Sequence, residues 1–502
     1  MDDVLRPIKK WLDKRMALET TLTLYDWDEQ TLAPCLAMEN TGRIVGILSE
    51  ELYKCMVNDD IKNFLEKWKD GVNEKYSYKL QYIIWKIGKD YEDNKKIPVD
   101  EYRKFSMIKA SANSVWENAK NNNDFSMFAP TLKEIIDYTK KFASYKKKDG
   151  QSLYDVLLDD YEPGFNEKKL DDFFELIKKE IVPLAKKKIN ESDSFDKSYN
   201  YRFYPAKEQE QFCNYLAGYL GFDFDRGIIA RSEHPFTTSL HNKDVRMTNH
   251  YYENDLEDSI FSCIHETGHA LYEQNIPDEL TQTLAGVLPY MGIHESQSRF
   301  YENVIGRSKE FWEPLYGKLV NTFNKNLEDV SLDTFINGIN KVNPTPIRTS
   351  ADELTYPVHI LIRYELEKKI INEDVDVNKL KDLWNEKYEE YLGIKPENDA
   401  QSILQDVHWS CGNFGYFPSY ALGNAFATQI YYSMEKEFDV KKELAKGNIS
   451  RINMYLCENV HKYGATISTD EILKRISGEE FNPDFYIRYL KEKFEDSNCK
   501  KC

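Results

Sequence analysis

The segment SIFSCIHETGHALYEQN, residues 259–275, carries the strongest signal for both fold and chemistry in this chain. Its apolar side chains recur at the spacing of one helical face: Ile260, Phe261, Ile264 and Leu271. Pro277 ends the pattern. On a helix, His265 and His269 are about 6 Å apart along the axis and about 40° apart around it, so both imidazoles project from one face. The segment is therefore predicted to be a helix that offers two ligands to one metal ion, as tetrahedral zinc requires.

A general base is expected next to these histidines. Glu266 follows His265 directly and would point toward the side of the ion where a bound water lies. Zinc lowers the pKa of its water toward about 7, so a nearby carboxylate can complete the deprotonation. The alternative is a surface helix with two satisfied histidines. The chain has only nine histidines, and Gly268 is tolerated inside the helix at a cost in stability, which favours the catalytic interpretation.

A third protein ligand would leave one position open for water and substrate. Glu273 lies four residues further along the same helical face, too far up the axis to close a tetrahedron easily. Glu295 lies in GIHESQSRFYEN, residues 292–303, after Pro289, where the chain can reverse into an antiparallel helix. His294 is the alternative to Glu295, and only one of them can face the ion because adjacent helical residues point about 100° apart. We expect Glu295 to be the ligand, on a helix face that it shares with Ser298, Arg299 and Glu302.

Length and composition exclude several classes of protein. With 502 residues, of which 41% are hydrophobic and 30% charged, the chain can bury a large core and is no small binding module or disordered chain. Its net charge of −18 repels phosphate backbones and anionic headgroups, so neither nucleic acid nor a membrane surface is an expected partner.

Residues 1–15 contain no apolar stretch long enough for a signal peptide, and the eight cysteines are scattered. We expect a cytoplasmic protein, in which the CxxC tail of Cys499 and Cys502 is a frayed terminus.

Helical periodicity runs through most of the sequence, and strand-like alternation is rare. No break is long enough, or low enough in complexity, to be an interdomain linker. We therefore predict a mainly α fold in which residues 1–502 form one helical domain, with two lobes around a groove. A short β hairpin fits between Ile228 and Thr248, where the helical periodicity lapses.

Residues 407–434 contain no Asp, Glu, Lys or Arg, in a chain otherwise rich in charge. Their serine, asparagine and glycine residues make the segment too polar for a lipid-facing span, so it more naturally lines a buried cleft. The segment contains His408 and Tyr420, which are suited to donate hydrogen bonds to an oxyanion where charge develops. The chain has 34 tyrosines, so an ordinary core position is the alternative for Tyr420.

HETGHALYEQ at residues 265–274, followed by GIHESQSRFYEN, resembles the active-site segments of the carboxypeptidase Taq family of metallocarboxypeptidases. Further segments resemble motifs of that family in the same order: HPF at 234–236, DVRMT at 244–248, IRTSADE at 347–353 and QDVHW at 405–409. The likeness reaches both ends of the chain, through YDWDEQT at 25–31 and FNPDFYIRYLKEKF at 481–494. Ser402 stands where the family pattern GxxQDxHW has glycine, which leaves the polar residues of the motif intact.

This resemblance implies a mostly helical fold with a deep active-site groove, a zinc or cobalt ion, and homodimerisation. It also implies removal of single residues from the free carboxyl ends of peptides, with broad specificity. The family's metal ligands carry over to His265, His269 and Glu295, and its general base to Glu266, in agreement with the helical spacing. The stretch HWSCGNFGYFPSY, residues 408–420, also resembles the segment that bears the histidine and tyrosine oxyanion donors of other helical zinc peptidases.

An exopeptidase must recognise a free carboxylate, and the planar fork of an arginine binds a carboxylate bidentately. Arg348 is the preferred candidate, with Arg246 as its competitor. For either arginine the alternative is a structural ion pair with one of three acidic residues: Asp244, Asp352 and Glu353. His234 and His241 are further candidates for substrate contacts along the groove, although a histidine next to Pro235 is often a packing element of a loop.

We therefore predict a metallocarboxypeptidase in which a metal-bound water, activated by Glu266, attacks the last peptide carbonyl. His408 and Tyr420 would steady the oxyanion, and Arg348 would hold the terminal carboxylate. Zinc is the expected ion and cobalt the alternative, because two histidines and one carboxylate accept several divalent ions.

A helical metallo-oligoendopeptidase is the first alternative function. It would use the same metal but cleave internally. A catalytically silent peptide-binding relative would keep the ion as a structural element, and the intact Glu266 argues against it.

Overall fold

The computed structural model describes residues 2–68, 76–191, 195–287 and 290–495, and the tail with Cys499 and Cys502 lies outside these ranges. The described chain is mainly helical with one small sheet, which confirms the predicted fold class. Its helices are α1 (Asp2–Leu5), α2 (Lys9–Thr31), α3 (Met38–Met56), α4 (Asp59–Lys67), α5 (Tyr78–Lys95), α6 (Val99–Asn121), α7 (Ala129–Lys146), α8 (Leu153–Leu158), α9 (Glu167–Leu176), α10 (Val182–Glu191), α11 (Ala206–Leu220), α12 (Leu256–Gln274), α13 (Met291–Arg299), α14 (Lys309–Trp312), α15 (Tyr316–Thr322), α16 (Asn324–Leu327), α17 (Leu332–Ile339), α18 (Tyr356–Asn372), α19 (Leu380–Leu392), α20 (Phe417–Glu435), α21 (Val440–Ala445), α22 (Ile449–Asn459), α23 (Thr469–Ser477) and α24 (Asp484–Phe494). The strands are β1 (Gly227–Arg231), β2 (Thr237–His241) and β3 (Asp244–Asn249), and π-helical turns follow α9 (Ile177–Ile181) and α13 (Phe300–Ile305).

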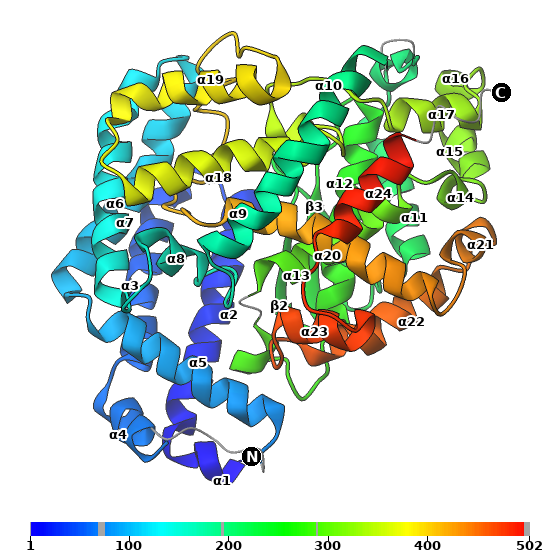
Figure 1. Ribbon diagram of the computed structural model, residues 1–502. Helices are drawn as coiled ribbons and strands as arrows, with labels where there is room; N and C mark the ends of the chain where they lie inside the picture. Colours follow the sequence, from blue (N-terminus) through cyan, green and yellow to red (C-terminus); the bar gives the residue numbers. More distant parts are fainter. Residues whose placement is uncertain (1, 69–75, 192–194, 288–289, 496–502) are drawn as a thin grey trace.

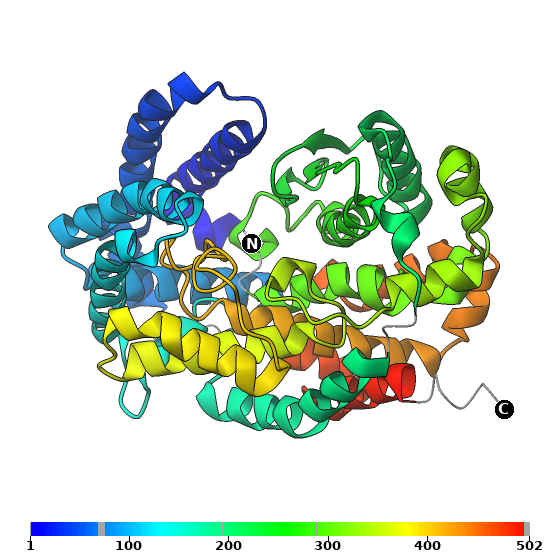
Figure 2. The same cartoon turned by 90° about the horizontal axis from the view of Figure 1, so that it is seen from above.

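Three helices form the centre of the molecule and position the candidate site. Helix α13 lies between α12 and α20, and α20 also packs against α18, α23 and α24 (Figure 1). The N-terminal helices α2 and α3 pack together as a hairpin that, seen from above, stands opposite α11 and α12 (Figure 2). One cluster of buried apolar side chains extends from Leu5 to Phe494. Among the described residues, no helix combines the length and apolar character that crossing a bilayer requires.

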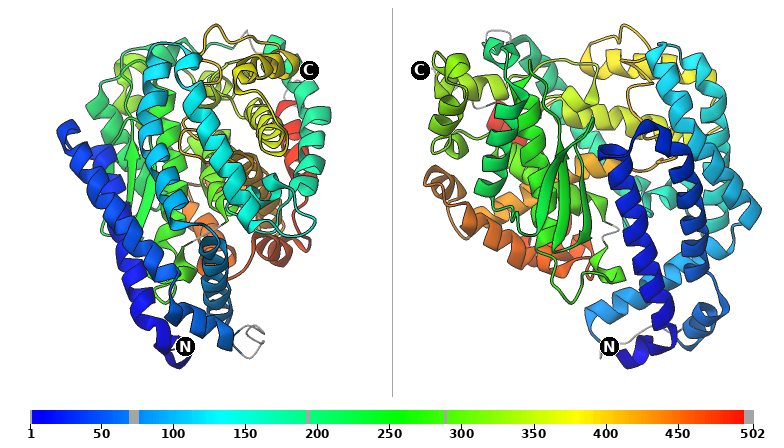
Figure 3. Two further views of the ribbon diagram at one scale, coloured as in Figure 1. Left: turned by 90° about the vertical axis from the view of Figure 1, so that its left-hand side faces the viewer. Right: turned by 180° about the vertical axis from the view of Figure 1, so that it is seen from behind.

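The small sheet has the strand order β1-β3-β2 and packs against α12 (Figure 3). Strands β2 and β3 are antiparallel and form the predicted hairpin. Strand β1 pairs with β3 in parallel, from Gly227 opposite Val245 to Arg231 opposite Asn249. This third strand was not predicted, because hairpin signals are local whereas β1 reaches β3 past the intervening β2.

Helix α12 begins and ends where its sequence signals indicate. The side chain of Asp255 accepts a hydrogen bond from the backbone N–H of Asp258 and caps the helix. Acidic side chains in the first turn interact favourably with the helix dipole. The helix ends at Gln274, shortly before Pro277, and its predicted apolar face is buried. His265 and His269 therefore project from a helix that is anchored on its other faces.

Two glycines allow α13 to approach both of its neighbours closely. A Cβ added at Gly268 of α12 would lie 2.6 Å from the carbonyl oxygen of Gln297 and 2.6 Å from the Cα of Ser298. A Cβ added at Gly423 of α20 would lie 2.5 Å from the Cγ of Glu295. Both distances are far below van der Waals contact, so neither position has room for a side chain. The glycine that lowers the helix propensity of α12 is thus required for the contact that brings Glu295 to the two histidines.

Replacing Gly268 by alanine is expected to destabilise the protein by about 1–3 kcal/mol and to weaken metal binding, because the methyl group meets backbone atoms that cannot rotate away. Thermal unfolding and metal content after dialysis measure the two effects. Gly46→Ala in α3 is the control, since an added Cβ there meets nothing within 4 Å. The control should be neutral or stabilising by up to about 1 kcal/mol. Equal shifts in the two variants would contradict the proposed close contact.

Candidate metal centre

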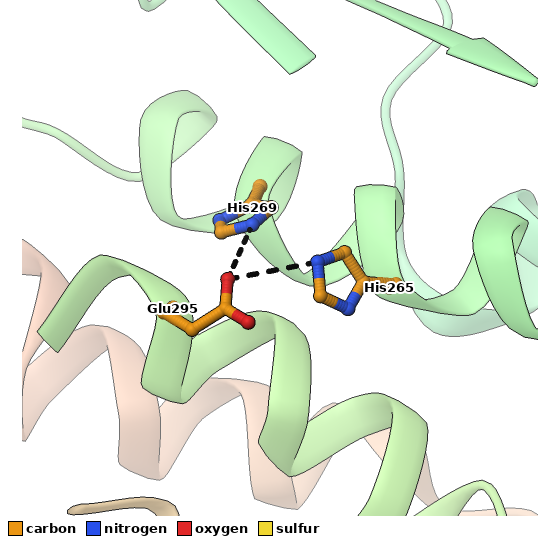
Figure 4. Close-up of side chains that lie close together, drawn as sticks. All are labelled: His265, His269 and Glu295. Carbon is orange, nitrogen blue, oxygen red and sulfur yellow. Dashed lines mark ion pairs between the residues drawn. The ribbon is translucent and has the colours of Figure 1, made fainter. Parts of the chain in front are cut away.

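Three side chains bring their ligand atoms together between α12 and α13. His265, His269 and Glu295 each offer one ligand atom, and these atoms lie within 4.8 Å of one another. Oε2 of Glu295 is 3.6 Å from Nε2 of His265 and 3.3 Å from Nε2 of His269. Figure 4 shows this single oxygen facing both imidazoles. One helix thus supplies two nitrogen ligands on one face, and the neighbouring helix supplies an oxygen opposite them.

This donor set fits a divalent cation. Metal bonds of about 2.1 Å at tetrahedral angles separate neighbouring ligand atoms by about 3.4 Å. The distances from Oε2 of Glu295 to the two imidazole nitrogens lie close to that value. Two imidazoles and one carboxylate suit zinc, cobalt and other divalent first-row metals.

The two alternative ligands engage each other instead. Nε2 of His294 lies 3.0 Å from Oε1 of Glu273. The ring of His294 stacks on the ring of His269, with 4.5 Å between the centroids and an interplanar angle of 17°. Their placement leaves Glu295 as the carboxylate that faces both imidazoles of the cluster.

A buried network of charges supports the cluster. Arg299 donates a hydrogen bond of 2.7 Å from Nε to Oε1 of Glu295, and one of 3.0 Å from Nη1 to Oε2 of Glu302. Oε2 of Glu302 also lies 2.8 Å from Nδ1 of His265, and Arg307 lies 3.5 Å from the other carboxylate oxygen. Glu302 stands in the π-helical turn after α13, a local structure that is frequent at functional sites. Glu302 holds the proton of His265 at Nδ1, which leaves the lone pair of Nε2 directed at the cluster.

This network also sets the protonation states of the ligands. Burial opposes ionisation of Glu295, yet Arg299 and His265 outweigh burial and lower the pKa of Glu295 below its usual range. Glu302 has its pKa lowered to about 2 against the effect of burial, chiefly by Arg299. Burial lowers the pKa of His269 to about 3. Burial acts in the same direction on His265, but Glu295 and Glu302 outweigh burial and raise the pKa of His265, so a cation bound at Nε2 would compete with a proton there.

Glu266 lies beside the cluster with one carboxylate oxygen tethered. Its Oε2 accepts a hydrogen bond of 2.6 Å from the hydroxyl of Thr237 in β2. Its Oε1 has no hydrogen-bond partner among the described residues. The residue is 7% exposed, and burial raises the pKa of its carboxyl group. A carboxylate that burial makes more basic, with one free oxygen, is suited to accept a proton from water.

His408 and Tyr420 form a second polar cluster. Nε2 of His408 lies 3.0 Å from the hydroxyl oxygen of Tyr420. Burial, together with the positive charge of Arg348, lowers the pKa of His408 to about 3, so its imidazole is neutral. Burial raises the pKa of Tyr420 well above its usual value, and Glu295 adds to this effect. Tyr420 therefore keeps its proton, and the second cluster lies within electrostatic range of Glu295, one of the candidate ligands.

Arg348 is buried in an ion pair with Asp406 and with none of its expected partners. Its Nε donates to Oδ1 of Asp406 over 2.9 Å, and its Nη1 donates to the hydroxyl of Tyr356 over 3.1 Å. No described residue accepts a hydrogen bond from Nη2. The three expected partners bond elsewhere: Asp244 to Arg246, Asp352 to Leu354 and Thr355, and Glu353 to Lys493. Asp406 was missed because it is 58 residues from Arg348, so no local pattern connects the two.

The remaining predicted contacts lie in and around the small sheet. Arg246 makes the structural ion pair that was its alternative, with hydrogen bonds of 2.8 and 2.9 Å to the two carboxylate oxygens of Asp244. His234 is exposed. His241 is half-buried, and its Nδ1 accepts a hydrogen bond from the backbone N–H of Lys243.

Glu367, for which no role was predicted, anchors the loop that carries His408. Its Oε1 accepts a hydrogen bond of 2.8 Å from the indole of Trp409, and its Oε2 accepts one of 2.9 Å from the backbone N–H of Gly415. Burial raises the pKa of Glu367 to about 7. The available signal was its position in α18 after the mainly apolar run of residues 358–362, in a helix that is buried along most of its length.

A sequence model of the carboxypeptidase Taq (M32) metallopeptidases matches residues 7–494. The chain belongs to this family. It is 41% identical to Carboxypeptidase 1 of Bacillus subtilis over 478 residues, which cover 95% of each protein. It is 33% identical over 480 residues to Thermostable carboxypeptidase 1 of Thermus thermophilus, covering 93% of this chain and 94% of the relative. The crystal structure of the M32 carboxypeptidase of Deinococcus radiodurans has a TM-score of 0.93 to this chain at 29% identity and covers 99% of both chains.

These comparisons confirm the predicted family and fold. They make the protein a metal-dependent carboxypeptidase and hence a peptide hydrolase. The shared fold covers the whole helical core that holds His265, His269 and Glu295 in place.

Substituting Glu302 by glutamine in this metallocarboxypeptidase is expected to weaken metal affinity by about 10- to 100-fold, because the acceptor that orients His265 loses its charge. Competition with a chromogenic chelator measures the affinity without reference to activity. Glu313→Gln is the control, since Glu313 is exposed and lies outside the network. An unchanged affinity in the Glu302 variant would show that the imidazole is oriented by other contacts.

Proposed function

We propose that this metallocarboxypeptidase holds one divalent ion through His265, His269 and Glu295, with zinc preferred and cobalt as the alternative. The observation that carries the proposal is the single oxygen of Glu295 that faces both imidazoles at distances suited to a shared cation. The free Oε1 of Glu266 beside this cluster supports a catalytic site rather than a structural one. A closed structural site would prefer four protein ligands and would need no base beside the ion.

Glu266 is the general base of the proposed reaction. The bound ion would supply polarisation of the peptide carbonyl and a more acidic water. Oε1 of Glu266 takes a proton from the attacking water as the oxygen of that water bonds to the carbonyl carbon of the last peptide bond. The same carboxyl group then gives this proton to the leaving amine as the C–N bond breaks, so the base is regenerated. The products are a shortened peptide and one free amino acid.

We propose that Tyr420 donates a hydrogen bond to the oxyanion and that His408 supports it through the tyrosine hydroxyl. A neutral His408 that carries its proton on Nε2 donates to the oxygen of Tyr420, which leaves the tyrosine proton available for the substrate. Because both groups are buried and already oriented, they need no reorganisation when charge develops on the carbonyl oxygen.

Arg348 is the proposed binding residue for the terminal carboxylate of the substrate. Its guanidinium carbon lies 4.9 Å from the centre of the Tyr420 ring, and Nη2 has no partner among the described residues. A substrate carboxylate bound there would lie next to Tyr420. The carbonyl of the last peptide bond would then be close to the residue that stabilises the oxyanion, as removal of the last residue requires. His234, His241 and Arg246 are proposed as weaker contacts along the peptide.

The family also supports wider proposals for this chain. We propose that residues 1–502 form one domain with the substrate groove between two lobes, and that the protein acts in the cytoplasm as a homodimer on free-ended peptides with broad specificity. The large buried cluster, whose members run from Leu5 to Phe494, supports one domain. The described cysteines that are free, namely Cys55, Cys213, Cys263, Cys411 and Cys457, are compatible with a reducing compartment.

Glu266→Gln is expected to lower kcat by about 10²–10⁴-fold, because the amide cannot accept the proton of the attacking water. Metal content should survive, since Glu266 is no ligand. Release of single amino acids from a free-ended peptide, followed by mass spectrometry with and without a chelator, measures the loss. Glu253→Gln, which alters an exposed carboxylate, is the matched control. Unchanged turnover in the Glu266 variant would refute the assigned base.

Arg348→Ala is expected to reduce kcat/KM on free-ended peptides by at least about 100-fold, because a charged hydrogen bond to the carboxylate is lost. Hydrolysis of the same peptide with an amidated end should change little, since the arginine has no carboxylate to bind there.

The products of the parent enzyme distinguish the two kinds of peptidase. Successive release of single residues identifies a carboxypeptidase, whereas paired internal fragments identify an endopeptidase. Equal cleavage of free and amidated peptides by the parent would exclude Arg348 from the proposed role.

A further inference from the structure

Thr237 makes the closest described contact to the carboxylate of Glu266. Its Oγ1 lies 2.6 Å from Oε2 of Glu266 and 3.1 Å from the main-chain oxygen of the same residue. A hydroxyl carries one proton, and the shorter distance assigns that proton to Oε2. Oε1 is then the oxygen of Glu266 that is left for chemistry.

The hydroxyl of Thr237 is held by the sheet and not by the helix that carries Glu266. Thr237 pairs with Met247 across β2 and β3. The backbone oxygen of the preceding residue, Phe236, accepts a hydrogen bond from the N–H of Thr248, and the N–H of Phe236 donates to the Thr248 hydroxyl. The ring of Phe236 packs edge-on against Trp27 of α2, with 5.5 Å between the centroids. Two separate elements, α12 and β2, therefore converge on a single carboxylate.

We propose that Thr237 is a positioning residue for the general base, which fixes the plane of the Glu266 carboxylate so that Oε1 faces the attacking water. This inference rests on the role of Glu266 in the proposed function. A carboxylate attached only to its helix rotates freely about its last torsion, and its two oxygens exchange places. The bond to Thr237 distinguishes the two oxygens. It also persists while Oε1 gains and loses the proton, so the base needs no reorientation between attack of water and departure of the amine.

A purely structural role for Thr237 makes a different prediction. The contact to the main-chain oxygen of Glu266 ties β2 to α12 whether or not Glu266 carries a carboxylate. If that tie were the purpose of the residue, loss of the hydroxyl would lower stability and metal content. In a variant that already lacks Glu266, loss of the hydroxyl would also reduce the remaining turnover, by the same factor as in the parent.

The test compares Thr237→Val with Thr237→Ser. Valine keeps the shape and removes the hydroxyl, and it is expected to lower kcat by about 10- to 100-fold with KM and metal content within about twofold of the parent. Serine restores the hydroxyl and should return kcat to within about threefold of the parent. Thr238→Val is the matched control, because Thr238 is the next residue of β2 and has no hydrogen bond from its side chain among the described contacts.

A double variant separates failure of this inference from failure of the proposed function. When Glu266 is glutamine, adding Thr237→Val should cause no further loss of kcat, because the two residues act as one unit. If Glu266→Gln itself leaves turnover unchanged, the proposed function falls. If Glu266→Gln abolishes turnover while Thr237→Val leaves kcat unchanged, only the role of Thr237 falls. Equal losses in the valine and serine variants, or a multiplicative loss in the double variant, would likewise overturn it.

Discussion

The backbones of α12 and α13 meet at Gly268 with no side chain between them, and the proposed metal centre depends on this contact. Metal bonds to nitrogen and oxygen are only about 2.1 Å long, so a displacement of α13 by one ångström would remove Glu295 from the coordination shell. Gly423 of α20 closes the other side of α13 in the same way. The packing of three helices thus sets where the ligand residues stand, and the contacts of Arg299 and Glu302 orient their side chains.

Charge balance places a second constraint on the same region. The buried carboxylates of Glu266 and Glu295 and the largely covered one of Glu302 are accompanied by the guanidinium groups of Arg299 and Arg307. These groups leave one net negative charge beside two imidazole nitrogens, which favours a divalent cation. Without a cation or a proton, a negative charge taken out of water would be costly. The network that orients the ligands therefore also supplies the electrostatic preference for the ion.

Local patterns in the sequence predicted the parts of the site that depend on helical spacing. His265, His269 and Glu266 follow from one helix with clear start and stop signals, and the preference for Glu295 over Glu273 follows from the rise per residue. Contacts between distant segments were missed, such as Asp406 with Arg348 and Glu367 with the loop around His408. Helical periodicity also did not reveal the π-helical turn Ile177–Ile181, which stands just before Pro183, a residue without the N–H that regular helical hydrogen bonding needs.

The proposed metal ligands and the proposed carboxylate-binding arginine belong to one connected structure. The guanidinium of Arg299, which holds Glu295, lies 4.2 Å from the centre of the Tyr356 ring. The hydroxyl of Tyr356 accepts the hydrogen bond from Arg348. A carboxypeptidase selects the last peptide bond by the span between the group that binds the terminal carboxylate and the group that polarises the carbonyl. With Arg348 in its proposed role, Tyr356 sets that span through rigid buried contacts, so the position of cleavage is determined by the packing of α18 against the core around α13.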